Sequence, residues 1–477
     1  MKIRRKHESR RFLALNAKSL VLGCVAMVVM LYVVFFAKVI EMSKVREKIP
    51  DSAYLRENLD IPADHGDHDQ LAIDRLGENE QAREVAPVAV TGAGDEPKKN
   101  AEATETTTIG FAVTITGCGK DPITEGAAVL KRSIHLASTH GNLGGKYDYK
   151  MYAIYHPSGL ECAKTLESLG YTLVERETPV AVKDIEGEYL RSKIEKNGCC
   201  GEKELVKLEA YTLTQHPVVV HLDLDTLILQ PLDGLFDWML AGDQAKSFDS
   251  SSTTVQWPED DVPQKINAFF TRDYNMGGAK KKRLKPVQGG FLVLRPDMKV
   301  YDEFVEIIRK GHFTDGGGWG GVTGVFYGSM TFQGIIPYFY DVLHPGTAVE
   351  LNHCVFNQMA DNPRNERTVN DVVHGKCMTG EDDCEDCRSR PLEEVFTAHF
   401  TLCQKPWWCL PQDQDMIQQR LCRKLHHQWY RIRSDLEESW GRSVMGEGDY
   451  QKDHFYGHCK SHGQKGYIYI QEPFGVP

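Results

Sequence analysis

The stretch "VVVHLDLDTLILQPLD", residues 218–233, decides the fold prediction because it sets two carboxylates inside an apolar run. Three valines lead in, and Asp223 and Asp225 follow two positions apart, with leucines and an isoleucine around them. Ionised carboxylates are costly to bury unless a metal ion or another cation compensates them. The run therefore predicts a strand over 217–222 with the two aspartates at its carboxyl end.

Strand-like and helix-like segments alternate before this stretch. We expect strands at 108–116, 149–156 and 171–177, and helices at 125–138, 159–170 and 203–215. Alternation at this pace is typical of an α/β fold with a parallel sheet and crossover helices. Ligands of open α/β sheets bind at the carboxyl ends of strands, which is where Asp223 and Asp225 are predicted.

Later segments extend the same pattern. A further strand is expected at 289–297, an amphipathic helix at 298–311 and a long amphipathic helix at 415–441. The polar region 244–285 is predicted to be irregular. Its basic run, 279–285, is interpreted as a solvated loop, the alternative being contact with an anionic donor or a lipid headgroup.

The N-terminal region predicts a membrane anchor. Residues 19–37 carry no charged side chain, and 19 residues at helical rise just cross a bilayer core of about 30 Å. Basic residues dominate before the run, which favours a cytoplasmic tail (1–18), a signal-anchor helix (19–40) and a disordered stem (41–107). A cleaved signal peptide is the alternative. Both interpretations put the remaining chain in a secretory lumen, and we expect a single-pass type II protein of the Golgi membrane.

Charge and cysteine content agree with this location. The formal net charge of −11 argues against a nucleic-acid partner. Of 13 cysteines, Cys24 lies in the predicted span, which leaves an even number outside it. We expect disulfides in an oxidising lumen, and a zinc site through Cys384 and Cys387 is the alternative.

Two carboxylates at a strand end suit a divalent cation with oxygen ligands, Mn²⁺ or Mg²⁺, that also binds substrate phosphates. A rival interpretation is an aspartyl phosphatase, in which the first aspartate would be the nucleophile. That motif usually opens its domain, whereas Asp223 comes more than a hundred residues after the first predicted strand.

Four segments, in order, resemble the glycogenin-type members of glycosyltransferase family 8. They are "LVKLEAYTLTQHPVVVHLDLDTLILQPLDGLFD", "VQGGFLVLRPD", "MTFQGIIPYF" and "HFTLCQKPW". The resemblance implies a GT-A fold, the Rossmann-like fold of nucleotide-diphospho-sugar transferases, over residues 108–410. Residues 411–477 would then be a C-terminal helical extension and tail.

The resemblance also implies roles for individual residues. Asp223, Asp225 and His399 would bind the metal ion, Lys405 would contact the diphosphate, and Gln333 would lie near the reacting sugar, which makes Lys405 and Gln333 the catalytic candidates. The remaining residues expected to contact the donor are Thr114, Ile115, Thr116, Gly117, Lys207, Leu224, Gly289 and Gly290.

The chain departs from the family pattern at Phe332, where an aspartate is usual, so a carboxylate near the sugar is missing or comes from elsewhere. The predicted function is a metal-dependent glycosyltransferase, and the resemblance implies that it is a retaining one. It would move a hexose or a uronic acid from a nucleotide sugar, expected to be a UDP-sugar, to a lumenal glycan, lipid or protein. A non-catalytic lumenal scaffold is the alternative, and a homodimer is left open.

Overall fold

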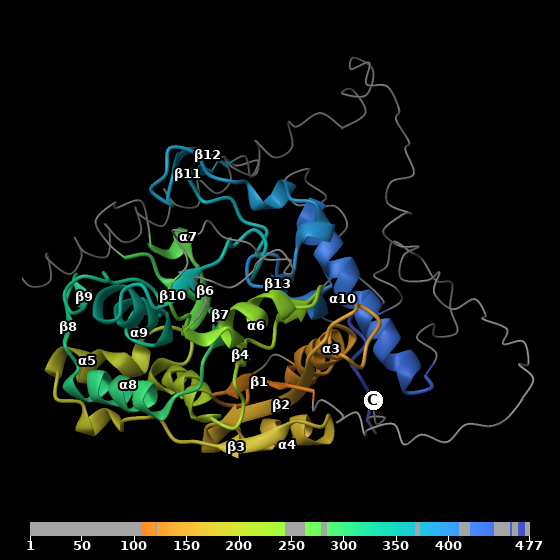
Figure 1. Ribbon diagram of the computed structural model, residues 1–477, viewed down its shortest axis with the longest axis horizontal. Coiled ribbons are helices and arrows are strands. Elements are labelled where there is room, and N and C mark those ends of the chain that lie inside the picture. The colour runs from red at the N-terminus through yellow and green to blue at the C-terminus, as the bar shows by residue number, and fades with distance from the viewer. Residues whose placement is uncertain are drawn as a thin grey trace, which may run out of the picture. The chain divides into compact units, whose positions relative to one another are not determined.

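The fold centres on a mixed β-sheet in which the strand before the two aspartates lies fourth of seven. The computed structural model describes residues 106–119, 122–243, 263–277, 284–367, 373–409, 420–442, 458–459 and 466–472. In these residues the main sheet has the strand order β10-β6-β7-β4-β1-β2-β3 (Figure 1). The predicted α/β class is therefore confirmed.

The strands of the main sheet are β1 (Thr108–Ile115), β2 (Asp148–Tyr155), β3 (Thr172–Glu175), β4 (Val219–Leu222), β6 (Ala268–Arg272), β7 (Val287–Leu294) and β10 (Ala348–Glu350). Three two-stranded ladders accompany it: β5 (Thr226–Ile228) with β13 (Thr397–His399), β8 (Phe313–Thr314) with β9 (Gly318–Trp319), and β11 (Arg364–Arg367) with β12 (Val373–Cys377).

The α-helices are α3 (Ile123–Leu136), α4 (Leu160–Ser168), α5 (Glu188–Lys193), α6 (Asp233–Leu240), α7 (Tyr274–Gly277), α8 (Met298–Lys310), α9 (Phe332–Pro337) and α10 (Arg420–Ser439). Shorter 3₁₀ turns are η2 (Pro157–Gly159), η3 (Val182–Asp184), η4 (Ile194–Lys196), η10 (Cys387–Ser389), η11 (Leu392–Glu394) and η12 (Pro406–Trp408), and α9 continues into a π-helical turn, η9 (Tyr338–Leu343).

One strand corrects the expectation of a parallel sheet. Strand β7 runs antiparallel to both β4 and β6, while β1, β2, β3 and β4 are parallel to one another. The sequence of a buried strand looks the same in either direction, so its apolar content predicts the strand but not its sense. The reversal places residues 289–291 of β7 next to the carboxyl end of β4, because Leu222 pairs with Phe291.

Two other expectations need correction. The region predicted as irregular, 244–285, contains β6, which pairs with β7 and β10. Its apolar stretch is short and lies between polar segments, so its periodicity is too weak to predict a strand. The predicted helix over 203–215 is a long 3₁₀ helix, η5 (Gly201–Thr212), rather than an α-helix.

Both faces of the sheet are covered by apolar layers. Alternate residues of β4 point to opposite sides: Val220 belongs to the layer formed with α3, α6 and α10, and Val219 to the layer formed with η5, α8 and α9. Neither side chain is exposed to solvent. Helices α3 and α10 pack against each other at one end of the molecule (Figure 1). With both faces covered, the ends of the strands are the part of the sheet open to a ligand.

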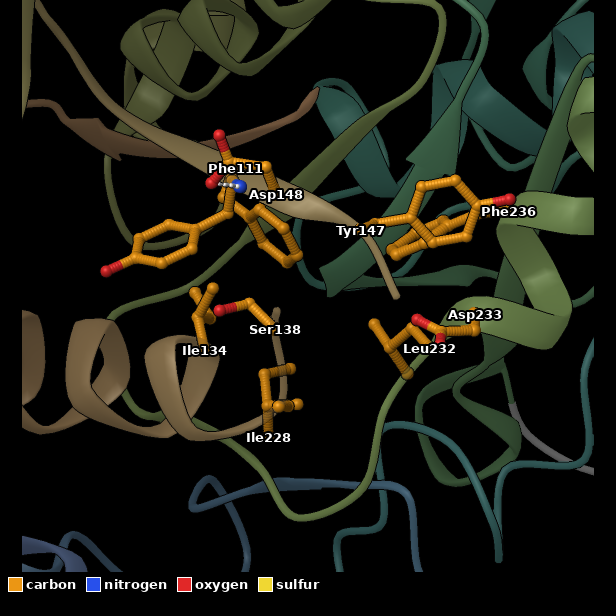
Figure 2. A pocket seen from close by; sticks show the side chains of 11 residues that line it. Phe111, Ile134, Ser138, Tyr147, Asp148, Ile228, Leu232, Asp233 and Phe236 are labelled. Carbon is orange, nitrogen blue, oxygen red and sulfur yellow. Dashed lines mark hydrogen bonds between the residues drawn. The ribbon is translucent and has the colours of Figure 1, made fainter. Parts of the chain in front are cut away.

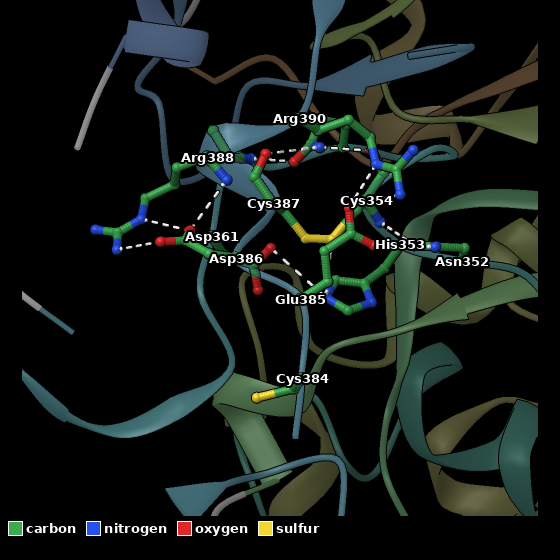
Figure 3. The surroundings of a disulfide bond; sticks show 12 residues. Asn352, His353, Cys354, Asp361, Cys384, Glu385, Asp386, Cys387, Arg388 and Arg390 are labelled. Carbon is green, nitrogen blue, oxygen red and sulfur yellow. Dashed lines mark hydrogen bonds and ion pairs between the residues drawn. A yellow bond between two sulfur atoms is a disulfide. The ribbon is translucent and has the colours of Figure 1, made fainter. Parts of the chain in front are cut away.

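The cysteines confirm the disulfide prediction. Cys384 pairs with Cys377 and Cys387 pairs with Cys354, so the two candidate zinc ligands belong to different bridges (Figure 3). His353 lies near Cys354 and Cys387, but sulfur atoms bonded to each other are not metal thiolates. The other bridges are Cys118–Cys162, Cys199–Cys200, Cys403–Cys422 and Cys409–Cys459.

The predicted tail, signal-anchor helix and nearly all of the stem lie outside the described residues. Among the residues that are described, none of the helices combines the length and the apolar character needed to cross a bilayer. Most of the basic run 279–285 and much of the C-terminal segment 411–477 also lie outside the described ranges.

Candidate active site

The D-L-D turn, residues 223–225, is fixed by main-chain hydrogen bonds at the end of β4. The amide of Asp223 donates to the carbonyl of Gly290 in β7 at 3.1 Å. The amide and the hydroxyl of Thr226 donate back to the carbonyl of Asp223 at 3.2 and 2.7 Å. The chain therefore turns sharply after the last core residue of β4, and both carboxylates leave the apolar layers.

A second element brings His399 to the same place. Strand β5, which follows the turn, pairs antiparallel with β13, and His399 lies opposite Thr226. The amide of Phe400 then donates to the carbonyl of Asp225 at 2.8 Å. The ladder thus brings His399 beside Asp225, which lies 174 positions earlier in the sequence.

The three predicted metal ligands converge. Nε2 of His399 lies 3.3 Å from Oδ1 of Asp225 and 4.0 Å from Oδ2 of Asp223. One ligand atom from each residue falls within 4.8 Å of the other two. Lysines flank the carboxylates: Nζ of Lys207 lies 2.8 Å from Oδ1 of Asp223, and Nζ of Lys405 contacts Oδ2 of Asp225. Acidic and basic groups thus alternate across the site.

The protonation of these groups follows from this alternation. Burial opposes ionisation of Asp225, but the charges and hydrogen bonds of His399 and Lys405 outweigh it and hold its pKa well below the usual value. Burial likewise opposes the charge of Lys207, yet the carboxylates of Asp223 and Glu204 raise its pKa above the usual value. Both groups are therefore charged at neutral pH.

The donor set fits a hard divalent cation. Two carboxylates and one imidazole nitrogen suit Mn²⁺ or Mg²⁺, which complete their shells with phosphate oxygens or water. The site is closed on the His399 side, where the side chain is 3% exposed, and open at Asp223, where it is 31% exposed. A phosphate group could therefore reach the ligands from the side of Asp223.

Two glycines of β7 form the wall behind the ligands. A Cβ atom on Gly290 would lie 2.3 Å from Cε1 of His399, so a side chain at 290 cannot coexist with the observed imidazole position. A Cβ atom on Gly289 would meet Gln333, Lys207 and Phe332 at 3.3–3.5 Å. Gln333 therefore lies beside Lys207, on the far side of Gly289 from His399.

Sequence reasoning missed Glu204 in this wall. Its carboxylate is buried, accepts a hydrogen bond from the hydroxyl of Thr331 at 2.5 Å and lies 3.8 Å from Nζ of Lys207. Phe332 stands where the family usually has an aspartate. Its side chain is fully buried, with the ring 5.6 Å from Nζ of Lys207. The spacing of Glu204 and Lys207, three apart in a helical segment, was the available signal.

The four residues at the end of the first strand that were expected to contact the donor, 114–117, differ in how far they are exposed. The hydroxyl of Thr114 is hydrogen bonded to Nε2 of the buried His221 at 2.8 Å, and the side chain of Ile115 is buried in the core. Thr116 and Gly117 follow the strand end and are partly exposed. Leu224 lies between the two aspartates, and its carbonyl packs against Gly126. A Cβ atom on Gly126 would lie 2.3 Å from that carbonyl oxygen.

A small hollow elsewhere in the described residues does not include these side chains. It lies by the start of β2, between α3 and α6, and its lining is mostly apolar (Figure 2). Its two carboxylates are already hydrogen bonded, Asp148 to the amide of Tyr149 at 2.7 Å and Asp233 to the amide of Lys146 at 2.9 Å. The amino end of β2 is far along the strand from the D-L-D turn, so this hollow is no part of the site.

The solved structures that resemble this chain include glycosyltransferases. No protein-family profile and no curated protein sequence matches the chain. An active-site mutant of LgtC is 13% identical over 69% of this chain and 96% of its own, with a TM-score of 0.38. Galactosyltransferase LgtC with donor and acceptor sugar analogs is 14% identical over 70% and 99%, with a TM-score of 0.36. Mouse xyloside xylosyltransferase 1 is 12% identical over 53% and 87%, with a TM-score of 0.32.

The class of the fold follows from the sheet itself. A mostly parallel sheet with one reversed strand, covered by helices on both faces and ending in the D-L-D turn, is an α/β fold of the GT-A type, as predicted. With identities this low, the substrates of LgtC and the xylosyltransferase are not carried over to this chain.

Proposed function

We propose that the chain is a metal-dependent, retaining glycosyltransferase of family 8 that uses a nucleotide sugar, a UDP-sugar in the first instance. The observation that carries the proposal is the convergence of Asp223, Asp225 and His399, flanked by Lys207 and Lys405, at the carboxyl end of β4. A purely structural role is a poor explanation of this cluster, because bringing five ionisable groups together costs desolvation free energy that no burial of apolar surface offsets there.

The chemistry assigns each side chain a task. The two aspartates and His399 would hold Mn²⁺, or Mg²⁺ in its place, whose charge would stabilise the departing nucleoside diphosphate. Lys405 would leave Asp225 for a phosphate oxygen of the leaving group and donate a charge-assisted hydrogen bond there. Lys207 would keep Asp223 oriented, and Gln333 would orient the sugar. The acceptor hydroxyl would attack from the face on which the diphosphate leaves.

Location and acceptor are proposed on the sequence. The charge-free run 19–37 with its basic flank supports a type II signal-anchor helix, and six disulfides support an oxidising lumen such as the Golgi. The acceptor would then be a lumenal glycan, lipid or protein. A homodimer belongs to the same proposal and would be tested by the mass of the detergent-solubilised chain.

A donor-panel assay tests the proposed activity. The full-length chain is incubated with UDP-sugars and Mn²⁺, and release of UDP is measured with and without chelator. Metal-dependent hydrolysis of at least one UDP-sugar, restored by added Mn²⁺ after chelation, is the expected result. The absence of nucleotide binding with Mn²⁺, Mg²⁺ or Co²⁺ would contradict the proposal and favour a lumenal scaffold, for which Phe332 is the supporting residue.

The same assay distinguishes the proposed glycosyltransferase from an aspartyl phosphatase. That enzyme would need a free nucleophilic carboxylate at Asp223, whereas Oδ1 of Asp223 is paired with Lys207 and the amide of Asp223 is bonded to β7. Phosphatase activity blocked by beryllium fluoride, a mimic of aspartyl phosphate, would support that rival.

A further inference from the structure

The segment that carries Lys405 is cross-linked to the C-terminal extension at both ends. We call residues 403–409 the Lys405 segment. Cys403, two positions before the lysine, is bonded to Cys422 in α10, and Cys409, four positions after it, is bonded to Cys459. The extension was expected to be a separate helical addition to the catalytic domain, so this connection was not foreseen.

One face of α10 supports the segment between the two bridges. Nε2 of His426 lies 3.2 Å from the carbonyl oxygen of Gln404, and the hydroxyl of Tyr430 donates to the carbonyl of Pro406. The rings of Trp407 and Trp429 lie 6.1 Å apart. The contacting positions of the helix are 422, 426, 429 and 430, which form one stripe at helical spacing.

The backbone of the segment needs such support. Gln404 and Cys409 have φ values of 58° and 49°, in the left-handed region that residues other than glycine rarely adopt. Such a conformation is strained and persists only where the surroundings of the residue determine it. The two strained residues bracket Lys405, and both are held by contacts with the extension.

The same helix is also tied to the D-L-D turn. Nη1 of Arg433, further along α10, donates to Oε2 of Glu125 in α3 at 2.8 Å, with both side chains buried. The next residue, Gly126, is packed against the carbonyl of Leu224 so closely that a Cβ there would lie 2.3 Å away. Helix α10 therefore contacts the Lys405 segment directly and the turn of the aspartates through α3.

We propose that α10 is a positioning element of the active site, and that Tyr430 and the Cys403–Cys422 bridge hold the ammonium group of Lys405 where the donor diphosphate binds. The inference rests on the proposed function, because it assigns Lys405 to the diphosphate. Tyr430 and the bridge act through Lys405 and touch no substrate, so they are positioning residues rather than catalytic ones.

A double-mutant cycle on the full-length chain tests the inference. The probe is UDP with Mn²⁺, and its dissociation constant is measured by calorimetry for Tyr430→Phe, Lys405→Met and the double variant. Because misplacing Lys405 weakens its charge-assisted hydrogen bond to the diphosphate, we expect Tyr430→Phe alone to weaken UDP binding about tenfold. In the Lys405→Met background the same change should weaken it less than about twofold. Equal losses in both backgrounds would overturn the proposal.

A matched control lies on the same helix. Asp435 pairs with Nε of Arg132 in α3 at 2.5 Å rather than with the Lys405 segment. Asp435→Asn should leave UDP affinity unchanged, whereas a general effect of loosening α10 would lower it as much as Tyr430→Phe. The double change Cys403→Ser/Cys422→Ser should behave like Tyr430→Phe, and Cys377→Ser/Cys384→Ser, which removes the bridge at the end of β12, should behave like the wild type.

Hydrogen exchange tests the support without any nucleotide. The amides of Trp408 and Cys409 donate within the segment, to Lys405 and Pro406. In Tyr430→Phe and in the Cys403/Cys422 variant these amides should exchange at least several-fold faster, and in Asp435→Asn they should not. Unchanged exchange in the first two variants would overturn the proposal. A wild-type chain that binds no UDP would instead contradict the proposed function, and the inference would fall with it.

Discussion

Asp223 and Asp225 leave a strand in the middle of the sheet, whereas His399 and Lys405 lie on a segment with few strand neighbours. The first pair is held by main-chain hydrogen bonds between β4, β7 and the turn that follows β4. The second pair depends on the short β5–β13 ladder, two disulfides and the side chains of one helix. The first pair is thus held by the main sheet and is called the sheet half of the site; the second is attached through cross-links and one helix and is called the attached half.

The difference has a chemical meaning. The aspartates hold charge that must be present before any ligand arrives, and a rigid core can fix them permanently. Under the proposed function Lys405 would exchange a carboxylate for a phosphate oxygen, so its segment should be firm in backbone while the side chain, 24% exposed, can move. The two disulfides and the contacts with α10 hold the backbone on both sides of the lysine. The changes that follow test this difference, from the largest expected loss of free energy to the smallest.

Removing the charge of Asp225 should have the largest effect. Asp225→Asn takes away a predicted metal ligand and the carboxylate that orients both His399 and Lys405. We expect metal-dependent UDP-sugar hydrolysis to fall about 1,000-fold, roughly 4 kcal/mol. The same change at Asp237, a carboxylate of α6 bonded to Lys146 and Tyr147, serves as control and should leave activity unchanged. Hydrolysis within threefold of the wild type in Asp225→Asn would refute the metal role.

Acid should weaken the attached half through His426. Burial lowers the pKa of His426 to about 4 from its usual 6.5, so the unfolded chain binds this proton first as the pH falls. The stabilisation is complete above pH 6.5 and is lost toward pH 4, by about 3 kcal/mol. Urea unfolding of the wild type and His426→Gln across pH 4–7 isolates the contribution, because other buried histidines titrate equally in both. Parallel pH curves would contradict the prediction.

A methyl group at the contact between the halves should displace His399. In Gly290→Ala the new Cβ would lie 2.3 Å from the imidazole, and the β7 backbone cannot move away from β4. We expect Mn²⁺ affinity to fall about 100-fold, as for loss of an orienting contact at a metal site. Gly289→Ala is the matched control, since its nearest neighbour would be at 3.3 Å. Equal metal affinity in the two variants would show that His399 is not a ligand.

The smallest effect is expected at Glu204. Glu204→Gln keeps the shape and the contact with Thr331 but removes the negative charge beside Lys207. Turnover of the donor should fall about tenfold, with little change in UDP affinity, because the carboxylate lies toward Gln333 rather than toward the metal ligands. A loss of UDP affinity without a change in turnover would assign Glu204 to the diphosphate end.

The sequence predicted the sheet half better than the attached half. Apolar runs identify β1, β2, β4 and β7, and a polar pair that interrupts such a run marks the strand end. These signals are local. The direction of β7, the pairing of β5 with β13 and the partners of each cysteine depend on contacts between distant segments, which no single window of sequence contains. His399 was found through the resemblance to a family and not through its own surroundings.

Two residues show why the rest was missed. Glu204 looks like an ordinary solvated position of an amphipathic helix until the 3₁₀ geometry of η5 turns it toward Thr331. Tyr430 lies in a helix with a regular apolar stripe, so its sequence predicts packing and gives no hint that the hydroxyl reaches Pro406. Both are side-chain contacts across elements, which burial pattern alone does not specify.

The β5–β13 ladder has a consequence for folding during synthesis on the ribosome. Its two strands are separated by about 170 residues, so β5 emerges long before its partner exists. At translation rates of roughly 5–20 residues per second, His399 follows Asp225 by about 9 to 35 seconds. During that interval the aspartates have Lys207 as their cationic neighbour and lack their imidazole. A nascent chain truncated before residue 397 should therefore bind Mn²⁺ weakly, however completely its sheet has formed.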